Sequence, residues 1–186
     1  MGERFLWRLI ATAREQSGPD TLAGVRRLLE EEAAPEVIRF HRELVGVHRR
    51  ARGWDLLAAF GTLPGAGGIA GFADAISWLV LRGRRDFRRV LADPDELASW
   101  AVEPGEIAAA AGLLRAAPER LLPPHDPEED RRVFEEAIRQ ALGVAEPAGP
   151  PPGEPLQTDR ESLRRRYPRL VARYGLAAPD LMPGQR

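Results

Sequence analysis

Five arginines fall within eight residues near the middle of the chain: Arg82, Arg84, Arg85, Arg88 and Arg89. The arginine side chain binds oxyanions through two parallel N–H groups, so this cluster would suit a phosphate group or an acidic partner. The alternative interpretation is a solvated helix face, on which Asp86 offsets part of the positive charge. The chain has 27 Lys and Arg residues, and all of them are Arg. Arginine clusters are therefore weaker evidence of phosphate binding here than in a chain that also uses Lys.

The stretch Gly61–Gly71 contains five glycines and one proline, which predicts a loop between two helices. Within it, the six residues from Gly65 to Ala70 match the G-x-G-x-x-A pattern of dinucleotide-binding loops. That pattern requires a strand before it and a helix after it, whereas a helix is predicted before it here. Free backbone N–H groups at the start of the next helix would still accept an anion. We therefore name seven candidate ligand-binding residues: Gly67, Gly68, Gly71, Asp74, Arg82, Arg84 and Arg85.

Other side-chain chemistries find little support. The chain contains no Cys, which rules out disulfides, thiolate zinc sites, iron–sulfur clusters and cysteine nucleophiles. His41 and His48 lie seven residues apart and His125 stands alone, whereas metal ligands on a helix are usually three or four residues apart. No G-x-S-x-G nucleophile elbow occurs. The sequence therefore predicts no catalytic residue, no metal site and no cofactor.

The overall charge and hydropathy limit the kinds of partner. The formal net charge is −1 and the isoelectric point about 6.3, which argues against a broad nucleic-acid-binding role. No apolar run approaches the ~18 residues of a membrane span, so no membrane partner is expected. No signal-peptide pattern is visible at the N-terminus, which predicts a cytoplasmic protein.

Apolar residues recur at helical spacing through nearly the whole chain, and no period-two pattern typical of a strand occurs. The predicted helices cover about 5–16, 21–32, 35–60 with an interruption near Gly53, 72–82, 84–92, a start at Asp93, 104–117, 126–141 and 158–175. The predicted fold is therefore all-α: an irregular multi-helix bundle with a Pro-rich linker before a C-terminal helix.

Composition also divides the chain into segments. Residues 1–144 are expected to form the helical core domain. Residues 145–157, rich in Pro and Gly, are expected to form a linker. Residues 158–175 are expected to form a helix that docks on the core through Tyr167 and Leu170, and residues 176–186 a loose tail.

Three stretches resemble a known family when taken together. The first runs Phe5-Leu6-Trp7-Arg8-Leu9-Ile10, and the second contains Trp78-Leu79-Val80, Gly83-Arg84 and Asp93-Pro94-Asp95-Glu96-Leu97-Ala98. The third is Tyr167-Pro168-Arg169-Leu170. In order and spacing they resemble the bacterial domain-of-unknown-function 4240 family. The resemblance implies an all-helical, cytoplasmic bacterial domain, and it implies no established activity.

The chain departs from the family pattern at two places. The family's acidic pair falls on Ala70 and Gly71, and its Phe-Arg pair falls on Ala75 and Ile76. If those polar residues form the family's functional site, this chain is a diverged member that has lost it. Asp74 lies nearby as a partial substitute.

Three hypotheses about function stay open. The first is a non-enzymatic regulatory or protein-interaction module with an unidentified protein partner, which the lack of catalytic motifs favours over an enzyme. The second is an enzyme or binder of a nucleotide or phosphorylated small molecule at the Gly61–Gly71 loop and the Arg82–Arg89 cluster. The third is an immunity or antitoxin-like protein, whose partner would be a toxin. The sequence gives neither the ligand nor the oligomeric state.

Overall fold

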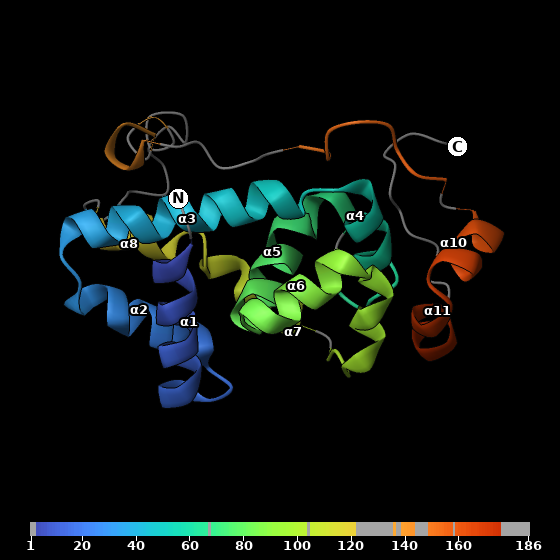
Figure 1. The fold of residues 1–186 in the computed structure, drawn as a ribbon, viewed down its shortest axis with the longest axis horizontal. Helices are drawn as coiled ribbons and strands as arrows, with labels where there is room; N and C mark the ends of the chain where they lie inside the picture. Colours follow the sequence, from blue (N-terminus) through green and yellow to red (C-terminus); the bar gives the residue numbers. More distant parts are fainter. Residues whose placement is uncertain are drawn as a thin grey trace. The chain divides into compact units, whose positions relative to one another are not determined.

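The computed structural model describes residues 3–66, 68–103, 105–121, 136, 139–143, 149–157 and 159–175. Across these residues the backbone forms α-helices and short 3₁₀-helices joined by turns and loops, and no strand occurs in this part of the chain (Figure 1). The predicted all-α class is therefore confirmed.

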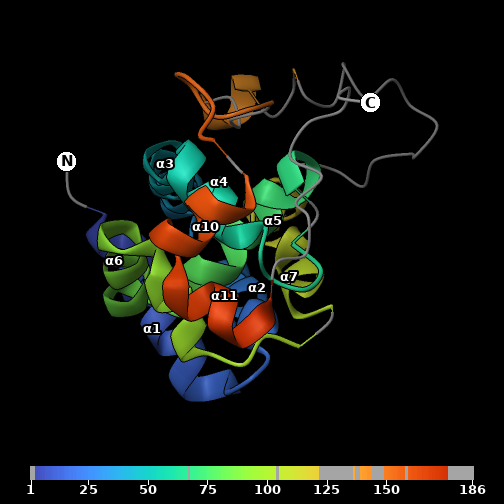
Figure 2. The ribbon, with the colours of Figure 1, turned by 90° about the vertical axis from the view of Figure 1, so that its right-hand side faces the viewer.

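The helices follow one another with short connections up to Leu121 (Figure 1 and Figure 2). Their bounds are α1 (Arg4–Ser17), α2 (Thr21–Glu31), α3 (Ala34–Ala51), α4 (Trp54–Phe60), α5 (Gly68–Leu81), α6 (Arg84–Ala92), the 3₁₀-helix η1 (Pro94–Ser99), α7 (Glu106–Ala109), the 3₁₀-helix η2 (Ala110–Gly112), α8 (Ala116–Leu121), α10 (Arg160–Arg166) and α11 (Pro168–Tyr174).

Contacts between residues divide the chain into two compact units: residues 1–49 with 112–147, and residues 50–111 with 148–186. Each unit therefore joins two stretches that are far apart in the sequence. The division expected from composition, with a core over residues 1–144, follows the proline-rich stretch, whereas these units follow packing. Helices α10 and α11 belong to the same unit as residues 50–111.

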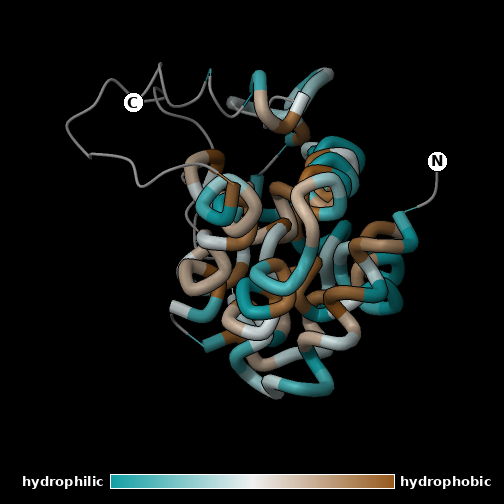
Figure 3. Tube along the Cα trace, turned by 90° about the vertical axis from the view of Figure 1, so that its left-hand side faces the viewer, coloured by the Kyte–Doolittle hydropathy of each residue, from teal (hydrophilic) through white to brown (hydrophobic). Residues whose placement is uncertain are grey.

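In the first unit, α1 and α2 pack side by side. The carboxylate of Asp20 caps α2 by accepting a hydrogen bond of 3.1 Å from the backbone N–H of Ala23, as its place before the helix predicts. Glu43 on α3 accepts a hydrogen bond of 2.9 Å from the backbone N–H of Leu6, which ties α1 to α3. Figure 3 shows hydrophobic and hydrophilic residues alternating along the helices, as amphipathic packing requires.

In the second unit, α5 is the central helix, because it packs against α4, α6 and α7. Phe72 and Trp78 on α5 meet Phe60 on α4 edge to face, with ring centroids 6.3 and 6.2 Å apart. The 3₁₀-helix η1 packs against α4, α6 and α11. Helices α4 and α6 thus hold η1 where α11 meets it.

The start of α5 differs from the loop expected over Gly61–Gly71. Gly68 to Gly71 form the first turn of α5 rather than part of a loop. A Cβ atom at Gly71 would collide with the carbonyl oxygen of Ala66, so only glycine allows the helix to lie this close to the preceding turn. Packing here overrides the low helix propensity of glycine.

The alanine-rich segment also differs from its prediction. The sequence predicts one helix that ends before Pro118, whereas the structure has α7 and η2 up to Gly112 and then α8, which contains Pro118. Pro118 is the third residue of α8. The backbone N–H groups of a first helical turn have no partner inside the helix, so the missing N–H of Pro118 costs little.

The C-terminal segment forms two helices where the periodicity predicted one. Pro168 supplies no N–H group and disfavours the helical conformation of Tyr167, whose ψ is 62°. Helix α10 therefore ends at Arg166, with Tyr167 as its C-cap, and α11 begins at Pro168. The helix predicted over residues 126–141 falls mostly outside the described residues, and the tail over 176–186 falls entirely outside them.

The burial of His41 on α3 yields the first prediction. Its side chain is fully buried, neither ring nitrogen has a hydrogen-bond partner among the described residues, and burial lowers its pKa from 6.5 to about 4. The folded state thus holds His41 neutral while the unfolded state takes up a proton near pH 6.5. The stabilisation is complete above that pH and is lost as the pH falls towards 4.

We expect the free energy of unfolding to fall by about 2 kcal/mol between pH 7.5 and pH 5 through this residue alone. The variant His41→Leu should lose that part of the pH dependence. Denaturant unfolding at several pH values, followed by circular dichroism, measures it. Equal pH dependence in the parent and in His41→Leu would contradict this account.

Candidate functional site

The glycines predicted to bind a ligand serve packing at the start of α5. Gly68 and Gly71 lie in the first turn of that helix, and Gly67 lies outside the described residues. The carbonyl oxygen of Ala66 fills the space beside Gly71. The chain's own backbone therefore occupies the place where a ligand would approach that glycine.

Asp74 lies one turn further along α5 and is half-buried. Burial raises the pKa of its carboxyl group. No hydrogen bond or ion pair joins it to another of the described residues. Asp74 is thus a partly desolvated acid, but the other predicted site residues do not surround it.

Arg82 follows the last turn of α5 and is held by aromatic rings and a carboxylate. Its guanidinium lies 4.2 Å from the ring centroid of Trp78 and 5.0 Å from that of Trp100. It also forms an ion pair of 2.8 Å with Glu106, whose carboxylate accepts a hydrogen bond of 2.9 Å from the indole N–H of Trp78. These contacts give Arg82 a structural role, because cation–π stacking and an ion pair fix its side chain.

Arg84 and Arg85 are exposed on α6. From Gly68 to Arg82, α5 advances by roughly 21 Å, because an α-helix rises about 1.5 Å per residue. The glycine end and the arginine end of α5 are therefore too far apart to grip one small molecule. The structure brings Arg82 close to Trp78 and Glu106, and it does not bring the predicted ligand-binding residues together.

The described part of the chain shows neither a metal cluster nor a membrane-spanning helix. No group of three or more His, Cys, Asp or Glu side chains there is arranged to hold a metal ion. None of its helices has the length and hydropathy needed to cross a bilayer.

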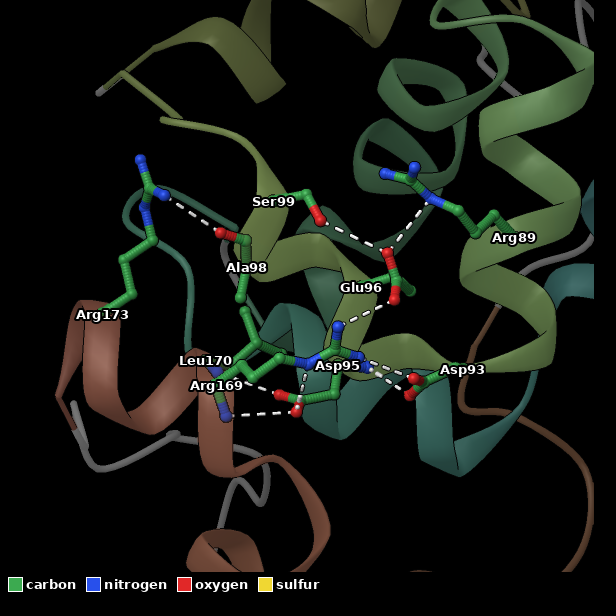
Figure 4. A network of polar contacts seen from close by, with 9 residues as sticks. All are labelled: Arg89, Asp93, Asp95, Glu96, Ala98, Ser99, Arg169, Leu170 and Arg173. Carbon is green, nitrogen blue, oxygen red and sulfur yellow. Dashed lines mark hydrogen bonds and ion pairs between the residues drawn. The ribbon is translucent and has the colours of Figure 1, made fainter.

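A polar network joins η1 to the start of α11 (Figure 4). Asp95 in η1 is buried, with 4% of its surface exposed. One of its carboxylate oxygens accepts a hydrogen bond of 2.9 Å from the backbone N–H of Leu170, and the other accepts one of 3.1 Å from the backbone N–H of Arg169. These are two first-turn N–H groups of α11, which have no acceptor within the helix. Asp95 thus caps α11 from a different part of the chain.

Three carboxylates surround the side chain of Arg169 (Figure 4). Its guanidinium lies 3.0 Å from Asp95, 2.7 Å from Glu96 and 2.6 Å from Asp93. Hydrogen bonds with Glu96 and Asp95 raise the pKa of Arg169, and the hydrogen bond from Arg169 is the largest cause that lowers the pKa of Glu96. Glu96 also pairs with Arg89 at 3.1 Å, so η1 receives positive charge from two sides.

A second carboxylate, Asp55 at the start of α4, receives the end of α10. It accepts a hydrogen bond of 2.5 Å from Nε of Arg166 and another from the hydroxyl of Tyr167. Burial alone would raise the pKa of Asp55, but the hydrogen bonds from Arg166 and Tyr167 outweigh it and lower that pKa. Burial and the hydrogen bond to Asp55 raise the pKa of the Tyr167 hydroxyl. Tyr167 and Leu170 are themselves buried, at 1% and 0% exposure.

Both ends of the C-terminal segment make further contacts within the same unit. The indole N–H of Trp54 donates to the carbonyl of Gly153 at 3.1 Å. At the far end, the Tyr174 hydroxyl donates to the carbonyl of Trp100 at 2.5 Å and accepts from the backbone N–H of Val102 at 3.1 Å. Residues 153–157 and 159–174 are therefore attached at several points along their length.

A shallow depression of about 420 Å³ lies beside α10. It is lined by Leu156, Gln157, Ser162, Arg165 and Arg166. Both arginines have acidic partners, Asp55 for Arg166 and Glu161 for Arg165. Those ion pairs leave the depression without an uncompensated charge among these side chains.

We refer to Asp55, Asp93, Asp95 and Glu96 as the acidic docking site. Sequence reasoning missed it, because it interpreted Asp93 and its neighbours only as the start of a helix. One signal was present: three carboxylates in four residues exceed the single cap that a helix start needs. Asp55 gave no such signal, because its partners lie more than 100 positions away in the sequence.

Removing the Asp95 side chain should therefore destabilise the second unit. In Asp95→Ala, two backbone N–H groups of α11 lose their acceptor and Arg169 loses its buried partner, so the free energy of unfolding should fall by roughly 2 kcal/mol. Glu161→Ala is the matched control, because the Glu161 side chain makes an exposed ion pair with Arg165, worth less than about 1 kcal/mol. Denaturant unfolding compares the two variants, and equal losses would contradict the capping role.

One protein family matches most of the chain. The sequence profile described as "Protein of unknown function (DUF4240)" matches residues 1–119. No curated protein and no solved structure matches. The matched region contains the whole acidic docking site and ends before α10 and α11. It contains the first two of the three sequence stretches that carried the resemblance, whereas the stretch Tyr167–Leu170 lies outside it. The match covers well over half of the 186 residues and confirms the resemblance, so the chain belongs to the DUF4240 family.

Proposed function

We propose that this protein is a non-enzymatic, regulatory protein-interaction module that recognises a short helix. The acidic docking site is the recognition surface, and the chain's own α10 and α11 occupy it. A protein partner with a helix of the same chemistry would replace them. The observation that carries this proposal is the set of contacts by which Asp55 and Asp95 hold the junction between α10 and α11.

The contacts at the docking site select for chemistry as well as charge. Asp55 accepts a hydrogen bond from the phenolic hydroxyl of Tyr167. Asp95 accepts hydrogen bonds from two successive backbone N–H groups, and the start of a helix offers such free groups. Pro168 favours such a start, because its fixed φ suits the first helical position. Leu170 fills an apolar space and is fully buried.

The charges at the docking site favour a ligand with a guanidinium group. Three carboxylates surround one side chain at this site. Arg169 forms an ion pair with each of them, namely Asp93, Asp95 and Glu96. A planar guanidinium has N–H groups on several sides and can bond all three carboxylates, whereas the donors of an ammonium all lie on one nitrogen. The proposed ligand is therefore a helix that begins with the order Tyr-Pro-Arg-Leu.

The connection to α10 supports displacement by a partner. Residues 149–157 form no helix and carry four prolines and two glycines, so they act as a tether of limited length. A tethered segment competes at an effective concentration of roughly millimolar. A partner helix must therefore be abundant or bind more tightly than α10 and α11. Occupation of the acidic docking site by α10 and α11 would set the partner concentration needed for binding.

A labelled peptide with the sequence of residues 159–175 tests the proposal. The full-length variant Tyr167→Ala/Arg169→Ala weakens the chain's own segment and leaves the acidic docking site intact. We expect this variant to bind the peptide about tenfold or more tightly than the parent does, measured by fluorescence anisotropy. Addition of Asp95→Asn to the variant should remove most of that gain.

Two controls make the outcome decisive. A peptide with Ala in place of the Arg at position 169 should bind about tenfold more weakly, and circular dichroism should show native helix content in every variant. If the double variant loses helix content, the full-length single variant Arg169→Ala takes its place, because it weakens the docking of the chain's own segment less. Equal peptide binding by the parent and the opened variants, or no binding by folded opened variants, would overturn the proposal.

A further inference from the structure

The outer face of α6 carries three arginines without partners among the described residues. Phe87 and Val90 anchor the helix from below, at 3% and 0% exposure. Arg84, Arg85 and Arg88 point away from that anchor and are exposed. None of the three makes an ion pair or a side-chain hydrogen bond within the part of the chain that the structure describes. The neighbouring residues Arg82 and Arg89, by contrast, form ion pairs.

Two arginines next to this face do have acidic partners. Arg89 on the same helix pairs with Glu96 at 3.1 Å, and Arg82 just before it pairs with Glu106 at 2.8 Å. Arginines in this stretch of the sequence can therefore form ion pairs. Within residues 82–89, the lack of acidic partners among the described residues is specific to the outer face of α6. That face lies on a helix at the left of the view in Figure 2, with α10 and α11 nearer the centre.

The position of these arginines opposes helix stability. Arg84 and Arg85 occupy the first turn of α6, where the positive end of the helix dipole disfavours cations. Arg84 and Arg88 are four residues apart, a spacing at which like charges repel each other. An acidic partner would relieve both conflicts at once, whereas solvent alone only screens them.

An apolar residue continues the same stripe. Leu91 is 36% exposed, and among the described residues it is the large apolar side chain that stands out to solvent. Positions 84, 88 and 91 recur at the i, i+4, i+7 spacing, which places them along one line of the helix surface. Charged residues beside an apolar contact at helical spacing occur where one helix packs on another, as in coiled coils.

We propose that Arg84, Arg85, Arg88 and Leu91 form an interaction surface for an acidic amphipathic helix of a protein partner. Carboxylates one turn apart would pair with the arginines, and an apolar side chain of the partner would cover Leu91. A nucleic acid would leave Leu91 uncovered, and a bilayer would gain little from one leucine. This surface lies outside the acidic docking site, and the proposal does not depend on the function proposed above.

Two synthetic peptides of about 18 residues test this surface. They have the same Glu, Leu and Ala composition, but only one places Glu at i and i+4 and Leu at i+7. We expect the full-length protein to bind the patterned peptide about tenfold more tightly than the scrambled one. Binding should weaken by about tenfold when salt rises from about 50 to about 200 mM.

Variants then assign the binding to α6. Arg84→Ala/Arg88→Ala should weaken it about tenfold, and Leu91→Ala about fivefold. The matched control Arg4→Ala/Arg14→Ala removes two exposed arginines from α1 and should leave it unchanged. Circular dichroism confirms that each variant is folded, and Leu91→Ala keeps the test decisive if the double variant loses helix.

Four results would overturn the proposal. They are equal binding of the patterned and scrambled peptides, no binding of either, an equal loss in the Arg4→Ala/Arg14→Ala control, and tighter binding of oligothymidine or phosphatidylserine vesicles than of the patterned peptide. The last result would assign the arginine face to phosphate groups instead.

Discussion

The buried carboxylate of Asp95 is the constraint on which the arrangement of the second unit depends. A buried carboxylate is costly unless hydrogen bonds and opposite charge compensate it. Two backbone N–H groups of α11 and the guanidinium of Arg169 provide that compensation. The same contacts satisfy the start of α11, whose first N–H groups would otherwise lie unpaired beside buried Leu170. Docking thus compensates the buried charge of Asp95 and the unpaired N–H groups of α11 at the same time.

Local patterns predicted the elements well where one helix decides its own ends. Asp20 caps α2 as its position indicates, and α6 has the bounds that its apolar residues predict. Predictions differed from the structure where a distant segment decides. Gly71 is helical because Ala66 packs against it. Asp55 binds Tyr167 and Arg166 only because the fold brings the two ends of the unit together, and no spacing rule encodes such a pair.

The departures from the family pattern are consistent with the packing of α5. The positions that resemble the family's Phe-Arg pair hold Ala75 and Ile76, and both are fully buried. The position of one of the acids holds Gly71, which contacts the backbone of Ala66. If the family carries acids and an arginine at these positions, their joint absence here leaves no charge buried without its partner. The clusters of charged side chains described above lie elsewhere in this chain, at the acidic docking site and on α6.

Amide hydrogen exchange at the start of α11 measures the central claim directly. First-turn N–H groups of a helix normally exchange quickly, because nothing in the helix accepts them. If Asp95 caps α11, the N–H groups of Arg169 and Leu170 should exchange at least about tenfold more slowly in the parent than in Asp95→Ala. Exchange of these two groups at the same rate in both proteins would contradict the account.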